Sequence, residues 1–136
     1  MSQLSSLWKA FINKRFLPEG EITMDFNINQ DGNATVITLK GSLLADIQTR
    51  EILDKVGSLV QEGKVHFVVD MSQLKFINSS GLGMLLTCLL KARKNRGDLV
   101  LANVPEQVSN LLSITKLTSV FTIAESVSEA KAQVSA

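Results

Sequence analysis

The sequence predicts an α/β fold: a mixed β-sheet of about five strands with about four helices packed on it, plus an N-terminal helical extension. Two observations support this class. Apolar and polar residues alternate over 22–28, and the turn signal at 30–33 separates them from a second β-rich run at 34–39, as in a β-hairpin. From Ile47 onward, helical and strand patterns alternate, which predicts parallel crossovers.

The later elements follow from apolar spacing and from the residues that end them. The expected order is a helix from Ile47 to near Gly63, a buried strand at 65–69, a helix over about 80–95, a strand at 99–102, a helix from Pro105 to Ile114 with proline in its first position, a strand at 120–123 and a helix at 126–134. The helix over 80–95 carries a broad leucine face that includes Leu90, and its last turn is basic. Helices are therefore expected on a sheet that starts with a hairpin.

Residues 1–17 form a separate amphipathic pattern before this domain. Leu4, Leu7, Trp8, Phe11 and Ile12 recur at helical spacing, and the break at 18–20 follows them. We therefore expect an N-terminal extension at 1–20 and a single domain at 21–136. The extension is expected to pack on its own domain or on a second subunit, so a homodimer through it is an open alternative.

Composition limits the classes of partner. The net charge of +1 argues against nucleic acid as a partner, and no apolar run reaches the roughly 20 residues needed for stable membrane insertion. The N-terminus lacks the apolar core of a secretory signal. The single cysteine, Cys88, lies in a leucine-rich helix and is expected to be a buried thiol outside any disulfide or zinc site. These features favour a cytoplasmic protein.

The most informative segment is 70–83, where a strand runs into a helix and places Ser79 and Ser80 at the junction. Either serine can cap the helix, the simpler interpretation, or carry a phosphate at the helix start. Gly81 and Gly83 fall in the first turn, where glycine is unfavourable. Close approach of another backbone, from a neighbouring strand or from a partner protein, would justify them.

No enzyme chemistry is expected. The only histidine, His66, reads as a strand residue with a hydrogen-bonded ring, and the sequence has no Gly-x-Ser-x-Gly elbow, phosphate loop or dinucleotide fingerprint. The carboxylates Asp46, Glu51, Asp54 and Glu62 are spread as on a solvated helix face. We therefore expect no catalytic residue, cofactor or metal.

Residues 68–72 and 74–83 resemble the signature of the STAS domain, the fold of bacterial anti-sigma factor antagonists. The resemblance covers roughly 22–134 and includes the segments 41–43 and 112–121. It implies that an anti-sigma factor with serine kinase activity phosphorylates Ser79, with Ser80 as the alternative. It also implies that the unphosphorylated form binds this partner and frees a sigma factor. The expected docking residues are Asn78, Ser79, Ser80, Gly81, Leu82, Gly83, Met84 and Asp46.

Two positions depart from the family pattern. Asn78 stands where many members have aspartate, and Leu44 stands where aspartate is frequent, so that Asp46 would have to substitute for it. The extension at 1–20 also lies beyond the usual domain. An alternative therefore stays open: a STAS scaffold, or a regulatory subunit of a transporter ATPase or a stress-sensing complex, without phosphorylation.

Overall fold

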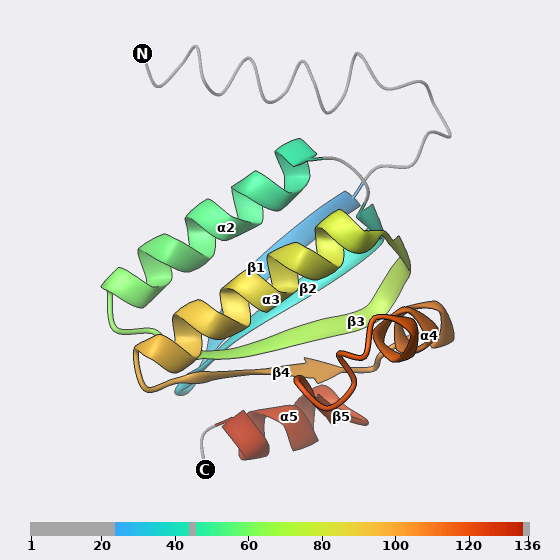
Figure 1. Cartoon of the computed structure of the whole chain (residues 1–136). Coiled ribbons are helices and arrows are strands. Elements are labelled where there is room, and N and C mark those ends of the chain that lie inside the picture. The colour runs from blue at the N-terminus through green and yellow to red at the C-terminus, as the bar shows by residue number, and fades with distance from the viewer. Residues whose placement is uncertain (1–23, 44–45, 135–136) are drawn as a thin grey trace.

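The computed structural model describes residues 24–43 and 46–134, and the N-terminal extension predicted at 1–20 lies outside them. A five-stranded sheet forms the centre of the molecule (Figure 1). The elements are β1 (Met24–Asp31), β2 (Ala34–Leu43), α2 (Asp46–Gln61), β3 (His66–Ile77), α3 (Ser79–Lys94), β4 (Asp98–Ala102), α4 (Glu106–Ile114), β5 (Thr122–Ala124) and α5 (Val127–Val134).

The sheet has the order β1-β2-β3-β4-β5. Strands β1 and β2 are antiparallel and form the predicted hairpin, whose register pairs Asp31 with Ala34 across a turn with Gly32 at a φ of 61°. All later neighbours are parallel, because a helix precedes each returning strand. The predicted mixed sheet with its packed helices is therefore confirmed for the described residues.

Helices cover both faces of the sheet. The larger core joins side chains from α2, α3 and α4 to one face, with Ile52, Leu85 and Leu112 among its buried residues. A smaller cluster on the other face joins Val68 and Val100 to α5. Leu90 is 57% exposed, so the predicted leucine face of α3 is narrower than expected, because Leu90 lies on the solvent side of the helix.

Strand β3 is longer than the predicted 65–69 and carries two extra residues relative to β2. Its pairing moves from Thr38↔Asp70 to Lys40↔Gln73, and again from Gly41↔Leu74 to Ser42↔Phe76. Each extra residue on one strand is a β-bulge, which shifts the alternation of faces. As a result the second half of β3 buries every third residue, Met71, Leu74 and Ile77, and the strand continues to the serine junction.

Two element boundaries have clear local causes. Gly97 follows α3, and a Cβ there would lie 1.9 Å from the carbonyl oxygen of Val65, so only glycine fits. Pro105 was predicted as the first helical residue of α4 but is its N-cap, because its backbone is extended at φ −69° and ψ 159°.

In the described parts of the chain, no helix is both long and apolar enough to cross a membrane.

Candidate functional site

The predicted site lies at the carboxyl end of β3, where one residue connects the strand to α3. β3 ends at Ile77 and α3 begins at Ser79, so Asn78 alone forms the connection. Ile77 is buried, Asn78 is half-buried, and Ser79 and Ser80 are both exposed. Open parallel sheets place their functional loops at this edge.

Asn78, rather than a serine, caps α3. Its backbone is extended, at φ −102° and ψ −177°, and its Oδ1 accepts a hydrogen bond of 2.9 Å from the N–H of Gly81. The expectation that Ser79 or Ser80 caps the helix is therefore wrong, because both serines are already inside it. Among the described residues neither serine hydroxyl has a hydrogen-bond partner. Helix capping therefore does not account for either serine.

The two glycines of the first turn differ. Gly81 is buried, whereas Gly83 is exposed, and a Cβ added to Gly83 would meet no atom within 4 Å. The neighbouring-strand explanation for Gly83 is therefore wrong, since no part of the described structure approaches it. The fold itself does not require glycine at position 83, and the missing side chain would allow another molecule to approach the backbone closely.

The other expected docking residues fall into two groups. The side chains of Leu82 and Met84 are buried in the larger core, at 2% and 3% exposure, and are therefore not presented to a partner. Asp46 is the first residue of α2, which begins after the described end of β2, and its side chain lies outside the described residues. The surface that remains at the start of α3 consists of Asn78, Ser79, Ser80 and Gly83.

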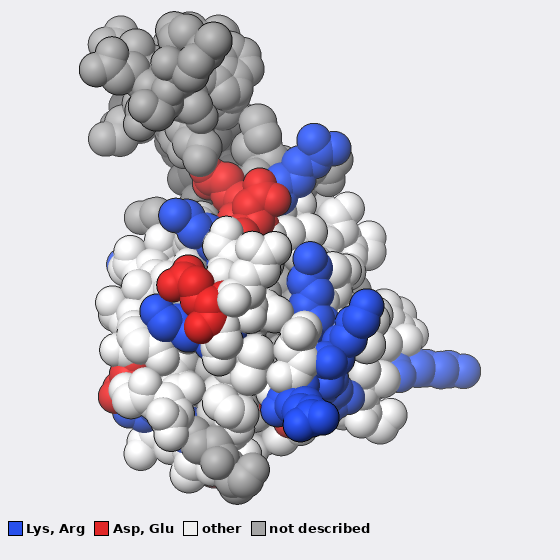
Figure 2. Space-filling model, turned by 90° about the vertical axis from the view of Figure 1, so that its left-hand side faces the viewer, with Lys and Arg blue, Asp and Glu red and all other residues white. Residues whose placement is uncertain are grey.

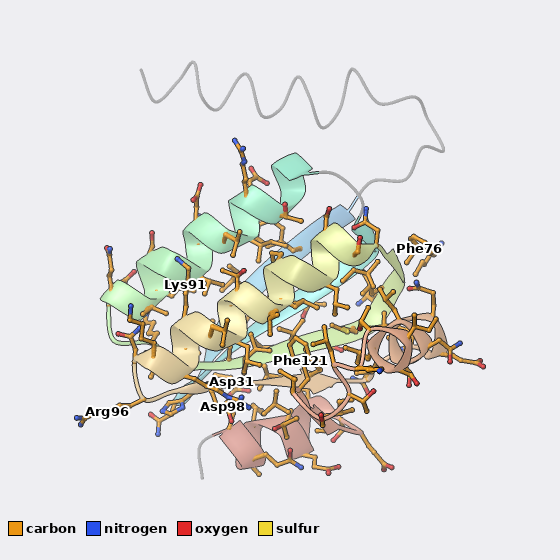
Figure 3. All side chains as sticks on the ribbon, viewed as in Figure 1. Asp31, Phe76, Lys91, Arg96, Asp98 and Phe121 are labelled. Carbon is orange, nitrogen blue, oxygen red and sulfur yellow. The ribbon has the colours of Figure 1, made fainter. Side chains whose placement is uncertain are left out.

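Phe76 adds an apolar side chain to this surface. It is the penultimate residue of β3 and is 41% exposed, and Figure 3 shows it projecting outward beside the start of α3. Simple alternation would place Phe76 on the same face as buried Leu74, and the β3 bulges reverse this. No signal in the sequence marks these bulges, so the residue could be found only from the structure.

Gln107 holds the end of β3 in place. Its Oε1 accepts a hydrogen bond of 3.1 Å from the N–H of Ile77, and its Nε2 donates one of 3.1 Å to the carbonyl oxygen of Ile77. The amide of a helix side chain thus replaces a strand partner and fixes the residue next to Asn78. Sequence reasoning missed Gln107, because a glutamine near a helix start has no distinctive pattern.

Within α3, the charged side chains lie at the end opposite the serines. The first turn of α3 contains no acidic residue, and its basic residues Lys91, Arg93 and Lys94 lie in the last turn. Figure 2 shows the gathering of lysine and arginine at that opposite end. A helix of this length spans about 24 Å, well beyond a Debye length of about 8 Å. Within α3, an anion at Ser79 would therefore be stabilised by the N-terminal N–H groups and the helix dipole, not by the cations of the last turn.

The remaining reactive side chains do not join the site. His66 begins β3, and a strand of this length separates it from the serines by about 36 Å. Its Nδ1 is buried, and no described polar group reaches that atom, so the expected hydrogen bond is missing at this nitrogen. Burial raises the pKa of Cys88 from 9.0 to about 12. No cluster of potential metal ligands occurs among the residues that the structure describes.

The family model of the STAS domain matches residues 25–130. The chain belongs to the STAS domain family. The match includes the whole strand-to-helix junction with Asn78, Ser79 and Ser80, so the recognition from sequence is confirmed.

Proteins named as anti-sigma factor antagonists are among those that this chain resembles. The Bordetella bronchiseptica protein named "Putative anti-sigma factor antagonist BtrV" is 27% identical over 99 residues, which cover 68% of this chain and 85% of that protein. An anti-sigma factor antagonist from Mycobacterium paratuberculosis superimposes with a TM-score of 0.72 at 17% identity, covering 84% of this chain and 96% of that one. The Bacillus cell fate determinant SpoIIAA in its phosphorylated form gives 0.65 at 22% identity, covering 81% and 99%. At these identities the two structures establish the shared fold.

Proposed function

We propose that this STAS protein is an anti-sigma factor antagonist that works as a binding switch. In its unphosphorylated form it binds an anti-sigma factor with serine kinase activity and thereby frees a sigma factor. Phosphorylation of Ser79 ends the binding. The chain is then a substrate and a binding partner in the cytoplasm, not an enzyme, and its domain at 21–136 carries the switch.

The observation that supports this proposal most is the cap made by Asn78. Because Asn78 Oδ1 occupies the N–H of Gly81, α3 does not depend on either serine hydroxyl. Ser79 is exposed at the first helical position, accessible to a kinase, and its modification leaves the cap intact. The relative from Bordetella and the phosphorylated Bacillus SpoIIAA structure are consistent with such a role.

The physical effect of a phosphate is opposite for binding and for folding. It adds about −1.5 to −2 charges to a surface that otherwise presents Ser80, Gly83 and Phe76, and burying that charge in an interface is unfavourable. In the free protein the helix start tolerates the charge and stabilises it by about 0.3–1 kcal/mol. The switch therefore changes affinity with little change of structure.

The test combines modification and binding. The protein is incubated with ATP and the anti-sigma factor kinase encoded in the same genome, and the phosphorylated residue is mapped by mass spectrometry in wild type, Ser79→Ala and Ser80→Ala. The proposal expects a phosphate that disappears only in Ser79→Ala. A phosphate lost only in Ser80→Ala would move the site by one residue. If no phosphate is found, either after this incubation or in the protein purified from its own cells, the result would instead support the scaffold alternative.

A further inference from the structure

A groove runs between β1 and α2 at the edge of the sheet, away from the serine site. It has a volume of about 460 Å³ and is lined by Phe26, Asn27, Ile28, Lys55, Ser58, Leu59 and Glu62. Lys55, Ser58 and Leu59 lie on one face of α2 at the spacing i, i+3 and i+4, and Glu62 directly follows the end of the helix. The groove therefore follows one side of α2, next to β1.

The floor of the groove is apolar and only partly covered. Phe26, Ile28 and Leu59 pack against the larger core from its edge, but none of them is fully buried. β1 is the end strand of the sheet, and within the described residues it pairs with β2 alone. An additional apolar helix would complete the layer that α2 and α3 form on this face.

The chain itself carries a segment that fits. Leu4, Leu7, Trp8, Phe11 and Ile12 repeat the spacing of the α2 residues that line the groove, and as a helix they would span about 12 Å, against about 10 Å from Lys55 to Glu62. Eleven residues, 13–23, connect this segment to β1, which begins at Met24, two residues before Phe26. We infer that residues 4–12 dock as an amphipathic helix in the groove between β1 and α2 of the same chain.

Linker geometry favours the segment of the same chain over that of a second copy. Residues 13–23 reach at most about 36 Å, whereas Met24 and Ile28 are separated by only about 13 Å of strand. A short tether gives an effective concentration on the order of millimolar, far above the concentration of a second copy in a micromolar solution. The docking does not depend on the proposed switch, because the groove and the serine site share no residue.

Trp8 reports on this docking without labelling. It is the only tryptophan, and the chain has no tyrosine, so fluorescence excited at long wavelength comes from the segment alone. In the full-length protein the inference expects an emission blue-shifted from that of free tryptophan amide, weak quenching by iodide, and no change on hundredfold dilution. Emission and quenching equal to those of the free amide would overturn it, and a blue shift lost on dilution would assign the groove to a second copy instead.

Two matched variants locate the docking site. Ser58 is an exposed residue inside the groove, and Ser109 is an exposed residue on α4 outside it. Ser58→Arg is expected to shift the Trp8 emission to that of the free amide, whereas Ser109→Arg leaves it blue-shifted, with circular dichroism unchanged in both. A blue shift that persists in folded Ser58→Arg would refute the groove as the docking site.

Discussion

Replacing Asn78 by alanine removes the side-chain cap at the start of α3, and the structure allows its effect to be estimated. The substitution removes the 2.9 Å hydrogen bond that Asn78 Oδ1 accepts from the N–H of Gly81, and no acidic residue in the first turn of α3 compensates for its loss. Loss of such a cap costs about 1 kcal/mol of unfolding free energy. For a domain of this size, with an unfolding entropy of about 2.1 cal/mol/K per residue, the expected fall in Tm is about 4 °C.

Thermal and urea unfolding followed by circular dichroism measure this effect, and three variants serve as controls. Asn78→Asp keeps an acceptor and adds a negative charge at the helix start, so its stability is expected to equal or exceed that of wild type by about 0.3–1 kcal/mol. Ser79→Ala and Ser80→Ala are expected to stay within about 0.5 kcal/mol of wild type. The reasoning is refuted if either serine variant loses as much stability as Asn78→Ala.

Three further predictions follow from individual side chains. Gly83→Ala is expected to raise the unfolding free energy by up to about 1 kcal/mol, since its Cβ meets no atom within 4 Å, yet to weaken partner binding in a titration; unchanged binding would argue against a docking role. Gly97→Ala places its Cβ 1.9 Å from the carbonyl oxygen of Val65 and is expected to lower the unfolding free energy by about 3 kcal/mol. Gly57→Ala, whose Cβ would lie 3.9 Å from its nearest neighbour, is not expected to be destabilising. Equal unfolding curves for the two variants would contradict the close contact between Gly97 and Val65. Burial raises the pKa of Cys88 from 9.0 to about 12, so above pH 9 the thiol loses its proton in the unfolded chain but keeps it in the folded protein. The unfolding free energy of wild type relative to Cys88→Ala is therefore expected to fall by about 1.4 kcal/mol per pH unit above pH 9. A difference that stays constant up to pH 11 would disprove this prediction.

The fold was predictable because its local patterns agree with its topology. The hairpin followed from alternation around Gly32, and the parallel order followed from helices between strands. The length of β3 was not predictable, because two bulges replace alternation with burial of every third residue beyond Met71. A pattern of period three resembles neither a strand nor a loop, so the continuation to Ile77 is visible only in the pairing with β2.

The sequence predicted the junction between β3 and α3, but it did not identify the residue that caps α3. Asparagine and serine are comparable N-cap residues, so the sequence does not show which of Asn78, Ser79 and Ser80 is the last residue before the helix. That choice depends on where β3 ends, and the paired hydrogen bonds from Gln107 fix this end from a helix about thirty residues away. Local secondary-structure propensity does not reveal long-range contacts of this kind.

The central claim, that a charge on Ser79 controls binding, is tested most directly by isothermal titration of the anti-sigma factor with three variants. Ser79→Asp is expected to weaken binding by about 3 kcal/mol, on the order of a hundredfold in Kd, while its unfolding free energy does not fall. Ser79→Ala and Ser128→Asp, which places the same charge on exposed α5, are expected to bind as wild type does. A Ser79→Asp protein that is folded and binds with wild-type affinity would contradict the switch.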